Sequence, residues 1–360
     1  MKKIALISRS TLYDVPGGDT IQMQQTARHL AAWGYDATIH RTTDTLDYDR
    51  YQLFHFFNLT RPADILYHLD HIRKPIVLTP ILIDYSEYDR HHRTDTAGKL
   101  LRNIPESMTE YGKTVARWLR GKDAMRSMSY LWKGQQRSIR QVLSQTGMLL
   151  PNAEGEKRTI ESTYGYAGPS AVIPNGIEPE LFRPTADTKK DPFLVICAAR
   201  IEGIKNQLQL IRALNNTQFR LILIGKASPN QQDYYEACRK EAGQNISFVE
   251  HLPQQELVKY FARATVHALP SWFETCGLSS LEAAAMGCRP VISDRGYTRD
   301  YFGEAGFYCD PGDSASILSA VERAAAVDGT ASLQQKIKTE YTWQQAVEKT
   351  AAAYSKITTT

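Results

Sequence analysis

The feature that most constrains this chain is a double series of short apolar runs separated by helix-like stretches. Continuous apolar runs between helices are typical of parallel strands that are covered on both faces. The first series lies at 4–8, 36–40, 53–57, 75–81 and 147–152, and the second lies at 193–200, 219–225, 246–252, 265–271 and 290–294. We therefore expect an α/β protein in which two doubly wound, Rossmann-like domains face each other across a cleft.

A connector that contains Pro, Gly and Asn separates the two series. The stretch "VIPNGIEPELFRP" (172–184) interrupts the alternation, and residues of these types mark loops between elements. A length of 360 residues also suits two domains of ordinary size better than a single core. We expect an N-terminal domain over 1–170 and a C-terminal domain over 171–342.

Composition and residue spacing argue against a membrane-spanning protein, a secreted protein and a metal site. No apolar run is long enough to span a bilayer, and the run 4–7 is too short for a signal peptide. The five cysteines include no C-x-x-C pair, which is typical of reduced thiols in a cytoplasmic protein. No His or Cys spacing indicates a metal site. Asp47-Tyr48-Asp49 precedes an apolar run, and we interpret this D-x-D sequence as a polar turn.

Positive charge is concentrated in one segment of the chain. Residues 113–140 contain eight Lys or Arg and a single acid, whereas the net charge of the whole chain is +4. Apolar residues recur among these cations at roughly helical intervals: Val115, Trp118, Met125, Met128 and Trp132. This pattern is typical of a basic amphipathic helix at an anionic membrane surface. The alternative is a helix that packs its aromatic side chains into the N-terminal domain. Nucleic acid is not an expected partner, because no recognition module is readable.

Two loops that follow strands carry candidate phosphate-binding groups. Ligands of open parallel sheets bind outside the carboxyl ends of the strands. Gly17 and Gly18 precede a helix after the first strand, where paired glycines permit close approach of the backbone to an anion. Arg200 ends another strand and Lys205 lies five residues later, so the two cations can clamp a diphosphate. The alternative for the glycines is a flexible loop before an N-cap. The alternative for the two cations is a solvated loop with ordinary surface charges.

A third loop, "PSWFETCGLSSLEAAAMGCRPVISD" (270–294), places one glutamate before a helix and another inside it. Between Glu274 and Glu282, the stretch Gly277–Leu278–Ser279 supplies unpaired backbone amides at the helix N-terminus, which favour an anion. Carboxylates accept hydrogen bonds from vicinal hydroxyls. The loop therefore predicts a nucleotide sugar, with Glu282 on the ribose, the amides on the diphosphate and Glu274 on the sugar. The alternative is helix capping by Glu274 and a surface-exposed Glu282.

These loops together resemble retaining GT-B glycosyltransferases of family 4, the glycogen synthase and bacterial mannosyltransferase kind. Residues 270–283 are similar to the E-x7-E signature of that family, "ARIEGIKN" to its Arg…Lys pair, and "VIPNGIEPELFRP" to its interdomain connector. "PGGDTIQMQQTARHLAAWGYD" is similar to its N-terminal glycine loop. "YTWQQAVEKTAAAYSKI" (341–357) resembles the final helices that return to the first domain, so we expect 343–360 to belong to the N-terminal domain.

The resemblance implies transfer of a hexosyl group from a UDP- or GDP-sugar with retention of configuration and without a metal or other cofactor. Arg200, Lys205 and Glu274 would act in catalysis, the cations by neutralising the leaving diphosphate. The implied acceptor is a glycan, in particular a lipid-linked glycan, in bacterial surface polysaccharide or glycoconjugate synthesis. The protein would be cytoplasmic or peripheral at the inner face of the membrane.

The chain also departs from the family pattern. Thr275 and Cys276 stand where Gly and an aromatic residue are common. We expect Cys276 in the donor site and an intact amide cradle, although the sugar specificity could change. Many members carry a histidine near the reacting centre. His55 and Asp84 are the acceptor-side candidates here, and His55 can equally be a buried, hydrogen-bonded core residue.

Two other functions remain open from the sequence. One is a different GT-B enzyme, such as a sugar-nucleotide epimerase or a phosphorylase. The other is a non-catalytic GT-B subunit that scaffolds a partner. Degenerate donor residues would mark a scaffold, and the four residues Arg200, Lys205, Glu274 and Glu282 are intact.

Overall fold

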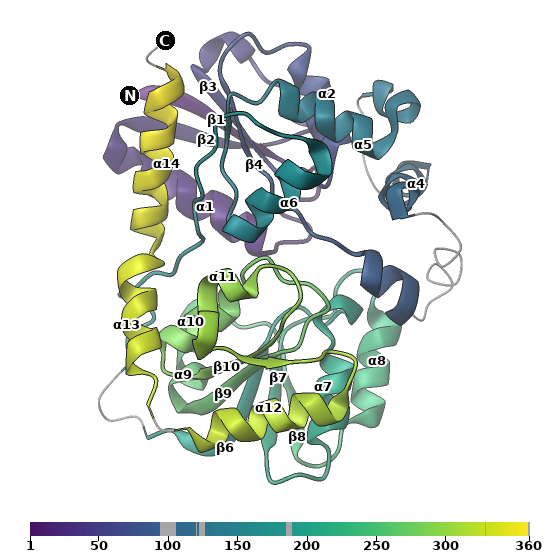
Figure 1. Ribbon diagram of the computed structural model, residues 1–360, viewed down its shortest axis with the longest axis vertical. Coiled ribbons are helices and arrows are strands. Elements are labelled where there is room, and N and C mark those ends of the chain that lie inside the picture. The colour runs from purple at the N-terminus through teal and green to yellow at the C-terminus, as the bar shows by residue number, and fades with distance from the viewer. Residues whose placement is uncertain (94–105, 120, 122–126, 185–188, 328, 359–360) are drawn as a thin grey trace. The chain divides into compact units, whose positions relative to one another are not determined.

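A computed structural model describes the chain except residues 94–105, 120, 122–126, 185–188, 328 and 359–360 (Figure 1). The chain divides into two compact units. Unit 1 comprises Met1–Ser86, Thr94–Asn175 and Trp343–Thr360, and unit 2 comprises Glu87–Arg93 and Gly176–Thr342. Unit 1 extends past residue 170 because the chain there pairs with the end of the sheet, where the Ile173 N–H donates to the Pro151 carbonyl at 2.8 Å. The sequence did not indicate that Glu87–Arg93 packs in unit 2.

Unit 1 is built on a five-stranded parallel sheet in the order β2-β1-β3-β4-β5. Its strands are β1 Lys2–Ser8, β2 Tyr35–Arg41, β3 Leu53–Phe57, β4 Ile76–Thr79 and β5 Met148–Leu149. Its helices are α1 Gly18–Leu30, α2 Pro62–Leu69, α4 Glu106–Leu119, α5 Ser129–Ser144, α6 Glu154–Tyr164 and α14 Trp343–Thr358, with short turns at Ala31–Trp33 and Tyr48–Arg50. The strand order reverses between β1 and β3, which is the mark of a doubly wound sheet.

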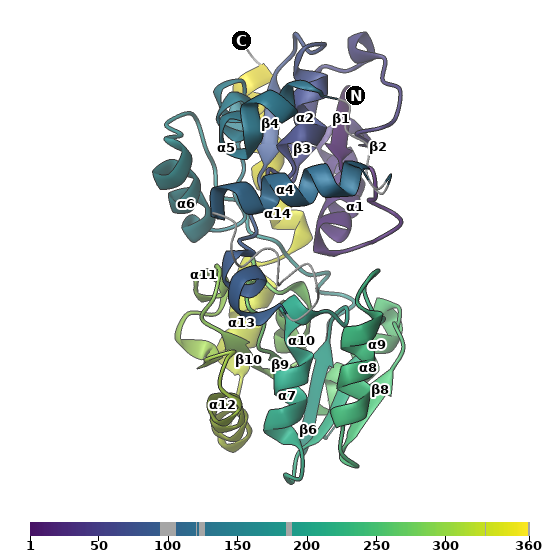
Figure 2. The same cartoon turned by 90° about the vertical axis from the view of Figure 1, so that its right-hand side faces the viewer.

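Helices cover both faces of this sheet. α1 packs beside β2 and α14, whereas α2 packs against α5 (Figures 1 and 2). The apolar side chains of β1, β3 and β4 fill the core between these layers, which explains why their runs are continuous rather than alternating. The C-terminal helix α14 is tied into this core, since the Tyr354 hydroxyl shares a hydrogen bond of 2.6 Å with Nδ1 of His55.

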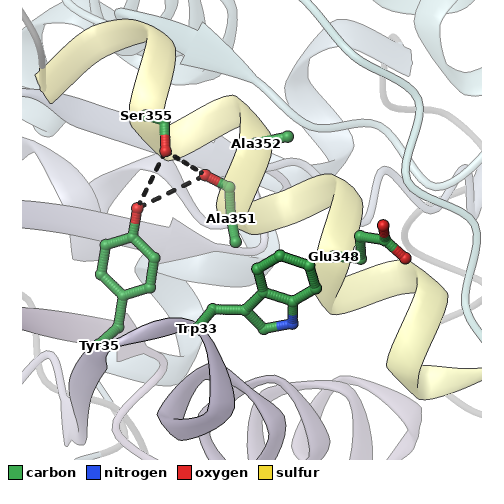
Figure 3. Close-up of a pocket in the computed structure, with 6 residues that line it drawn as sticks. All are labelled: Trp33, Tyr35, Glu348, Ala351, Ala352 and Ser355. Atoms are coloured by element: carbon green, nitrogen blue, oxygen red, sulfur yellow. Dashed lines mark hydrogen bonds between the residues drawn. The ribbon is translucent and has the colours of Figure 1, made fainter.

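A shallow hollow lies between α14 and the start of β2 (Figure 3). Its volume is about 210 Å³ and its lining residues are Trp33, Tyr35, Glu348, Ala351, Ala352 and Ser355. The Tyr35 hydroxyl lies 3.4 Å from the Ser355 hydroxyl and donates to the Ala351 carbonyl at 3.5 Å. The small alanines leave space for the indole of Trp33 along the helix (Figure 3).

Unit 2 is built on a six-stranded parallel sheet in the order β11-β10-β9-β6-β7-β8. Its strands are β6 Asp191–Ala198, β7 Arg220–Ile224, β8 Ile246–Val249, β9 Ala264–Leu269, β10 Arg289–Ser293 and β11 Phe307–Cys309. Its helices are α7 Gln207–Leu214, α8 Gln232–Glu241, α9 Gln254–Arg263, α10 Leu278–Ala285, α11 Thr298–Phe302, α12 Ser314–Ala326 and α13 Ala331–Glu340, with short helical turns at Tyr88–His92, Gly203–Lys205 and Gly303–Ala305.

The helices of unit 2 also form two layers. α7 packs beside α8 and α12, and α10 packs beside α13. Right-handed crossovers place α7 and α10 on opposite faces, because the chain runs outward from β6 in one direction and outward from β9 in the other. The strand order therefore reverses between β6 and β9, which lie side by side.

The expected fold class is confirmed by these two parallel sheets. Each of the ten apolar runs forms a strand. β4 and β5 are shorter than their runs because Pro80 and Pro151 follow them and lack the N–H that a sheet ladder needs. The helix that follows Gly17 and Gly18 forms as α1 and continues as a 3-10 turn, which ends at Gly34 in the left-handed conformation at φ 80°. None of the helices in the described part of the chain is long and apolar enough to cross a bilayer.

Candidate functional site

The point of strand reversal in unit 2 brings three candidate residues together. The loops after β6 and β9 begin on neighbouring strands, and the crevice between such loops is where open α/β sheets bind ligands. The β6 loop carries Arg200 and Lys205, and the β9 loop carries Glu274. Lys205 and Glu274 are 69 residues apart in the sequence, but the topology of the sheet makes their loops neighbours.

Lys205 and Glu274 form the central contact of the site. Nζ of Lys205 donates to Oε1 of Glu274 at 2.5 Å, and the Ser271 hydroxyl donates to the same oxygen at 2.8 Å. The Glu274 side chain is 8% exposed and that of Lys205 is 20% exposed. The carboxylate is thus held by a cation and a hydroxyl, and the pair neutralises itself in the protein without ligand.

The loop that carries Lys205 is fixed from both ends. Asn206 adopts a left-handed conformation and donates from Nδ2 to the carbonyls of Pro270, at 3.1 Å, and Pro311, at 2.7 Å. The Gln207 amide donates to the Arg200 carbonyl at 2.8 Å. The guanidinium of Arg200 is ion-paired with Glu202 at 3.0 Å and remains 40% exposed. Lys205 is therefore positioned by a rigid loop, whereas Arg200 extends from it towards solvent.

The backbone of Glu274 is held by the loop after β10. The Glu274 N–H donates to the Arg295 carbonyl at 3.3 Å, and the Tyr297 N–H donates to the Glu274 carbonyl at 2.9 Å. Gly296 lies between them at φ +87°, and a Cβ there would come within 2.1 Å of the Glu274 carbonyl oxygen. Only glycine permits this close passage of two loops.

The N-terminus of α10 faces the same crevice edge. Gly277 precedes the helix at φ 68°, and Leu278 and Ser279 are its first residues, whose N–H groups have no acceptor within a helix. Cys276 is 2% exposed and lies among the buried side chains, as do all five cysteines, none of which forms a disulfide. The amides at this helix start are thus available to an anion, whereas the Cys276 thiol is packed inside.

Glu282 lies one turn into α10 and is 6% exposed. The Gln254 amide at the start of α9 donates to its Oε1 at 2.6 Å. Burial raises the pKa of Glu282 to about 8, against the smaller opposing effect of the Gln254 hydrogen bond. Glu282 is thus no surface residue, and its carboxyl group is held neutral over much of the physiological range.

Four further candidates lie in unit 1. Gly17 is the N-cap of α1, and Gly18 is its first residue. Asp84 is exposed and accepts from the Ser86 N–H at 2.8 Å. His55 is 1% exposed and bonds through Nε2 to Thr79 at 2.8 Å and through Nδ1 to Tyr354. Burial lowers the pKa of His55 to about 3, so its surroundings are those of a core histidine.

Two buried polar groups near these sites were not foreseen. Arg9 follows β1 and forms a bidentate pair with Asp19 at 2.7 and 3.0 Å, while it also donates to the Thr11 and Val15 carbonyls. It thereby shapes the loop that ends at Gly17. His267 on β9 contacts the Ser280 hydroxyl at 3.2 Å and fixes α10 to the sheet. The only sequence signal that could have marked Arg9 is its position directly after a strand, which it shares with Arg200.

The described residues contain no group of three or more His, Cys, Asp or Glu side chains arranged to hold a metal ion. The expected D-x-D turn is confirmed, because Asp47 caps a 3-10 turn and accepts from the Asp49 N–H at 3.2 Å.

Comparison with known proteins gives a family match for most of the second unit. Residues 180–340 match the family of glycosyl transferases group 1. The glycogen synthase of Mycobacterium tuberculosis (strain H37Rv) is 29% identical over 196 residues, which cover 51% of this chain and 47% of that protein. The chain thus spans about half the length of the curated relatives it matches.

Solved structures match over almost the whole chain. The sucrose-phosphate synthase of Thermosynechococcus elongatus has a TM-score of 0.77 and 18% identity, and 99% of each chain is covered. The Anabaena protein HepE, in complex with UDP-glucose, has a TM-score of 0.71 and 14% identity, with 99% of this chain and 100% of that chain covered. The two parallel sheets are thus the GT-B fold, and residues 180–340 of the second unit match the family of glycosyl transferases group 1.

Proposed function

We propose that this protein is a glycosyltransferase that uses a nucleotide sugar as donor. In its finer form, the proposal is a retaining, metal-independent transfer of a hexosyl group from a UDP- or GDP-sugar to a glycan or lipid-linked glycan, in the synthesis of a bacterial surface polysaccharide or glycoconjugate. The observation that carries it is the Lys205–Glu274 pair at the strand reversal of unit 2, with the buried Glu282 in the helix that follows. Binding of UDP-glucose by HepE supports a donor of this class.

Each group has a task that fits its surroundings. The diphosphate binds between the α10 amides and the two cations, so Lys205 leaves Glu274 and turns to the phosphate oxygens. Glu274, which keeps its bond to Ser271, then accepts hydrogen bonds from hydroxyls of the sugar. Glu282, one turn into α10, accepts hydrogen bonds from the ribose hydroxyls. The donor thereby takes the place of the internal partners of Lys205 and Glu282.

The cations contribute most as the glycosidic bond breaks. Negative charge then grows on the leaving diphosphate, and an interaction that strengthens with that charge lowers the barrier. Lys205 is well suited because its loop is held rigidly by Asn206, so little reorganisation accompanies the reaction. Gly17 and Gly18, at the start of α1, are proposed as further donor contacts, and Asp84 as an acceptor-side group. His55 is the weaker candidate because both of its ring nitrogens are bonded in the core.

The acceptor is proposed to reach the enzyme at an anionic membrane surface through segment 113–140. Trp132 is 85% exposed and Met128 is 52% exposed, and Lys133, Arg137 and Arg140 beside them are exposed cations. Exposed Trp among cations is typical of a membrane interface. Residues 120 and 122–126 of this segment lie outside the described residues. Arg117 differs from these exposed cations, because it is half-buried near Arg61 and Asp64.

A panel of nucleoside diphosphates tests the proposal. We expect UDP or GDP to raise the melting temperature of the wild type, because a ligand at a hundred times its dissociation constant adds about 2.7 kcal/mol to the free energy of unfolding. ADP, CMP and dTDP complete the panel, and Glu282→Ala is the matched variant, in which the rise should be reduced. A wild type that responds to none of them would overturn the donor assignment and favour a scaffold subunit.

A further inference from the structure

One short segment from the first half of the sequence packs on the donor loops of unit 2. We call Glu87–Arg93 the strap. Its flanking residues in the sequence belong to unit 1, whereas the strap itself belongs to unit 2. It forms a helical turn over Tyr88–His92. Asp89 in this turn is 1% exposed, and its Oδ1 forms an ion pair with Nη1 of Arg93 at 3.2 Å. The strap is therefore a defined element rather than a simple linker.

The first contact of the strap is with the loop that carries Lys205. The hydroxyl of Tyr88 lies on Gly203, the first residue of the turn Gly203–Lys205. A Cβ at Gly203 would come within 1.8 Å of that hydroxyl oxygen, so the tyrosine fills the place where any other residue would have a side chain. The strap thus rests directly on the backbone two residues before the catalytic lysine.

The second contact is with the loop that carries Glu274. The ring of His92 stacks on Trp272, with ring centroids 3.4 Å apart and planes at 12°. The Trp272 N–H donates to the Ile204 carbonyl at 2.8 Å and so links this loop to the lysine loop. Trp272 is only 6% exposed. His92 therefore covers a tryptophan whose backbone links the loop of Glu274 to the loop of Lys205.

The third contact is with the loop behind Glu274. Nε of Arg295 donates to both carboxylate oxygens of Glu87, at 3.0 and 3.3 Å. The carbonyl of Arg295 in turn accepts from the Glu274 N–H. The strap thus touches the loops after β6, β9 and β10, and all three loops meet at Glu274.

We propose that the strap is a brace that holds these three loops in the geometry that binds the donor, with Tyr88 and His92 as positioning residues. The inference rests on the proposed function, since it concerns the same donor site. Loops that spend part of the time in other arrangements bind a ligand more weakly, in proportion to the fraction that is competent. Loss of a strap contact therefore lowers the affinity for the nucleotide, although no strap residue has to touch it.

The coupling is reciprocal. If the docked strap favours donor binding, then the bound donor must favour the docked strap by the same factor. We expect UDP to slow hydrogen exchange of the backbone amides of residues 87–93. This readout separates a brace from a residue that only supports the fold, because the latter would show the same protection with and without nucleotide.

The decisive variants are His92→Ala and its matched control His91→Ala. His91 is the same residue type and lies next to it, but it is exposed and the ring stacked on Trp272 is that of His92. We expect His92→Ala to raise the dissociation constant of UDP about three- to tenfold, which is the ratio that corresponds to the free energy of one aromatic contact. The donor KM should rise by the same factor while kcat changes less than about twofold. His91→Ala should leave both constants unchanged.

A charge exchange tests the third contact independently. Glu87→Arg and Arg295→Glu should each weaken UDP binding, and the double variant should restore part of the loss, because the ion pair forms again with its signs reversed. Unchanged UDP affinity in His92→Ala, together with equal exchange of the strap with and without UDP, would overturn the brace while leaving the donor site intact. A wild type that binds no nucleoside diphosphate would overturn the proposed function and the brace together.

Discussion

Binding of the nucleotide should release a proton from Glu282. The free protein holds this carboxyl group neutral, since burial raises its pKa to about 8. The ribose hydroxyls of the proposed donor would donate hydrogen bonds to it, and hydrogen bonds to the charged form favour that form. Binding therefore selects the carboxylate, and the proton leaves as the nucleotide arrives.

The size of the effect follows from that pKa. At pH 7 about one molecule in eleven carries the carboxylate, and at pH 9 about nine in ten do, so the dissociation constant should fall about tenfold between these values. Titration of the ligand itself contributes little to this pH dependence, because a terminal phosphate loses its second proton at about pH 6. Close to one proton per nucleotide should be released at pH 7 and close to none at pH 9.

Isothermal titration calorimetry with UDP measures both quantities. The number of protons follows from the observed enthalpy in buffers of different ionisation enthalpy. Glu282→Gln should bind with no pH dependence, because its amide does not titrate. Glu156→Gln is the matched control, since Glu156 is a fully buried glutamate in unit 1 whose pKa is raised to about 7. A wild-type affinity that is constant from pH 7 to 9, or a pH dependence that survives in Glu282→Gln, would refute the assignment of Glu282 to the ribose.

Four further outcomes are expected. Lys205→Ala should lower kcat about a hundredfold and the affinity for UDP much less, because charge develops on the diphosphate in the transition state. Single-turnover kinetics and UDP titration measure the two effects, and an equal loss of kcat and of UDP affinity would contradict this role. Gly296→Ala should lower the free energy of unfolding by about 3 kcal/mol in urea titrations, since its Cβ would press on the Glu274 carbonyl at a left-handed backbone position. Replacing Trp132 by Ala, and Lys133 and Arg137 by Gln, should weaken binding to anionic lipid vesicles at low salt, with neutral vesicles as the control; unchanged sedimentation with anionic vesicles would exclude this surface. The stability should be greatest at mildly acidic pH. His55 and His267, with pKa values lowered to about 3, remove stability as the pH falls below 6.5. Glu282 removes at most about 5 kcal/mol as the pH rises from 4.5 to 8, and Glu282→Gln should abolish this loss in thermal unfolding across the range.

Most of the fold could be predicted because buried parallel strands leave a strong local signal. Each of the ten apolar runs forms a strand, and the run at 53–57 has the observed ends. β11 was missed because its three residues, Phe307–Cys309, are too few to show a pattern. The strap was missed for another reason: its partners Gly203, Trp272 and Arg295 are far away in the sequence, and nothing local marks such a contact.

The residues proposed to bind the donor could be named from the sequence because motifs with fixed spacing mark them. Arg200, Lys205 and Glu274 lie in loops that follow strands, and Glu282 lies one turn into α10. Their internal partners could not be named, because the Lys205–Glu274 pair and the Gln254–Glu282 bond depend on which strands are neighbours. Burial of Glu282 is likewise a property of the packed helices α9 and α10, and the sequence alone allowed an exposed position.

The most direct test of the account is the release of nucleoside diphosphate from sugar nucleotides by the wild type and by Lys205→Ala. UDP-glucose and GDP-mannose are offered with EDTA present, with water or a mixture of glycans as acceptor. The account predicts steady release from one of them by the wild type, stimulated by an acceptor, and about a hundredfold slower release by Lys205→Ala with nearly the same donor affinity. Equal rates for the two proteins, or no release from either donor by a wild type that binds UDP, would contradict it.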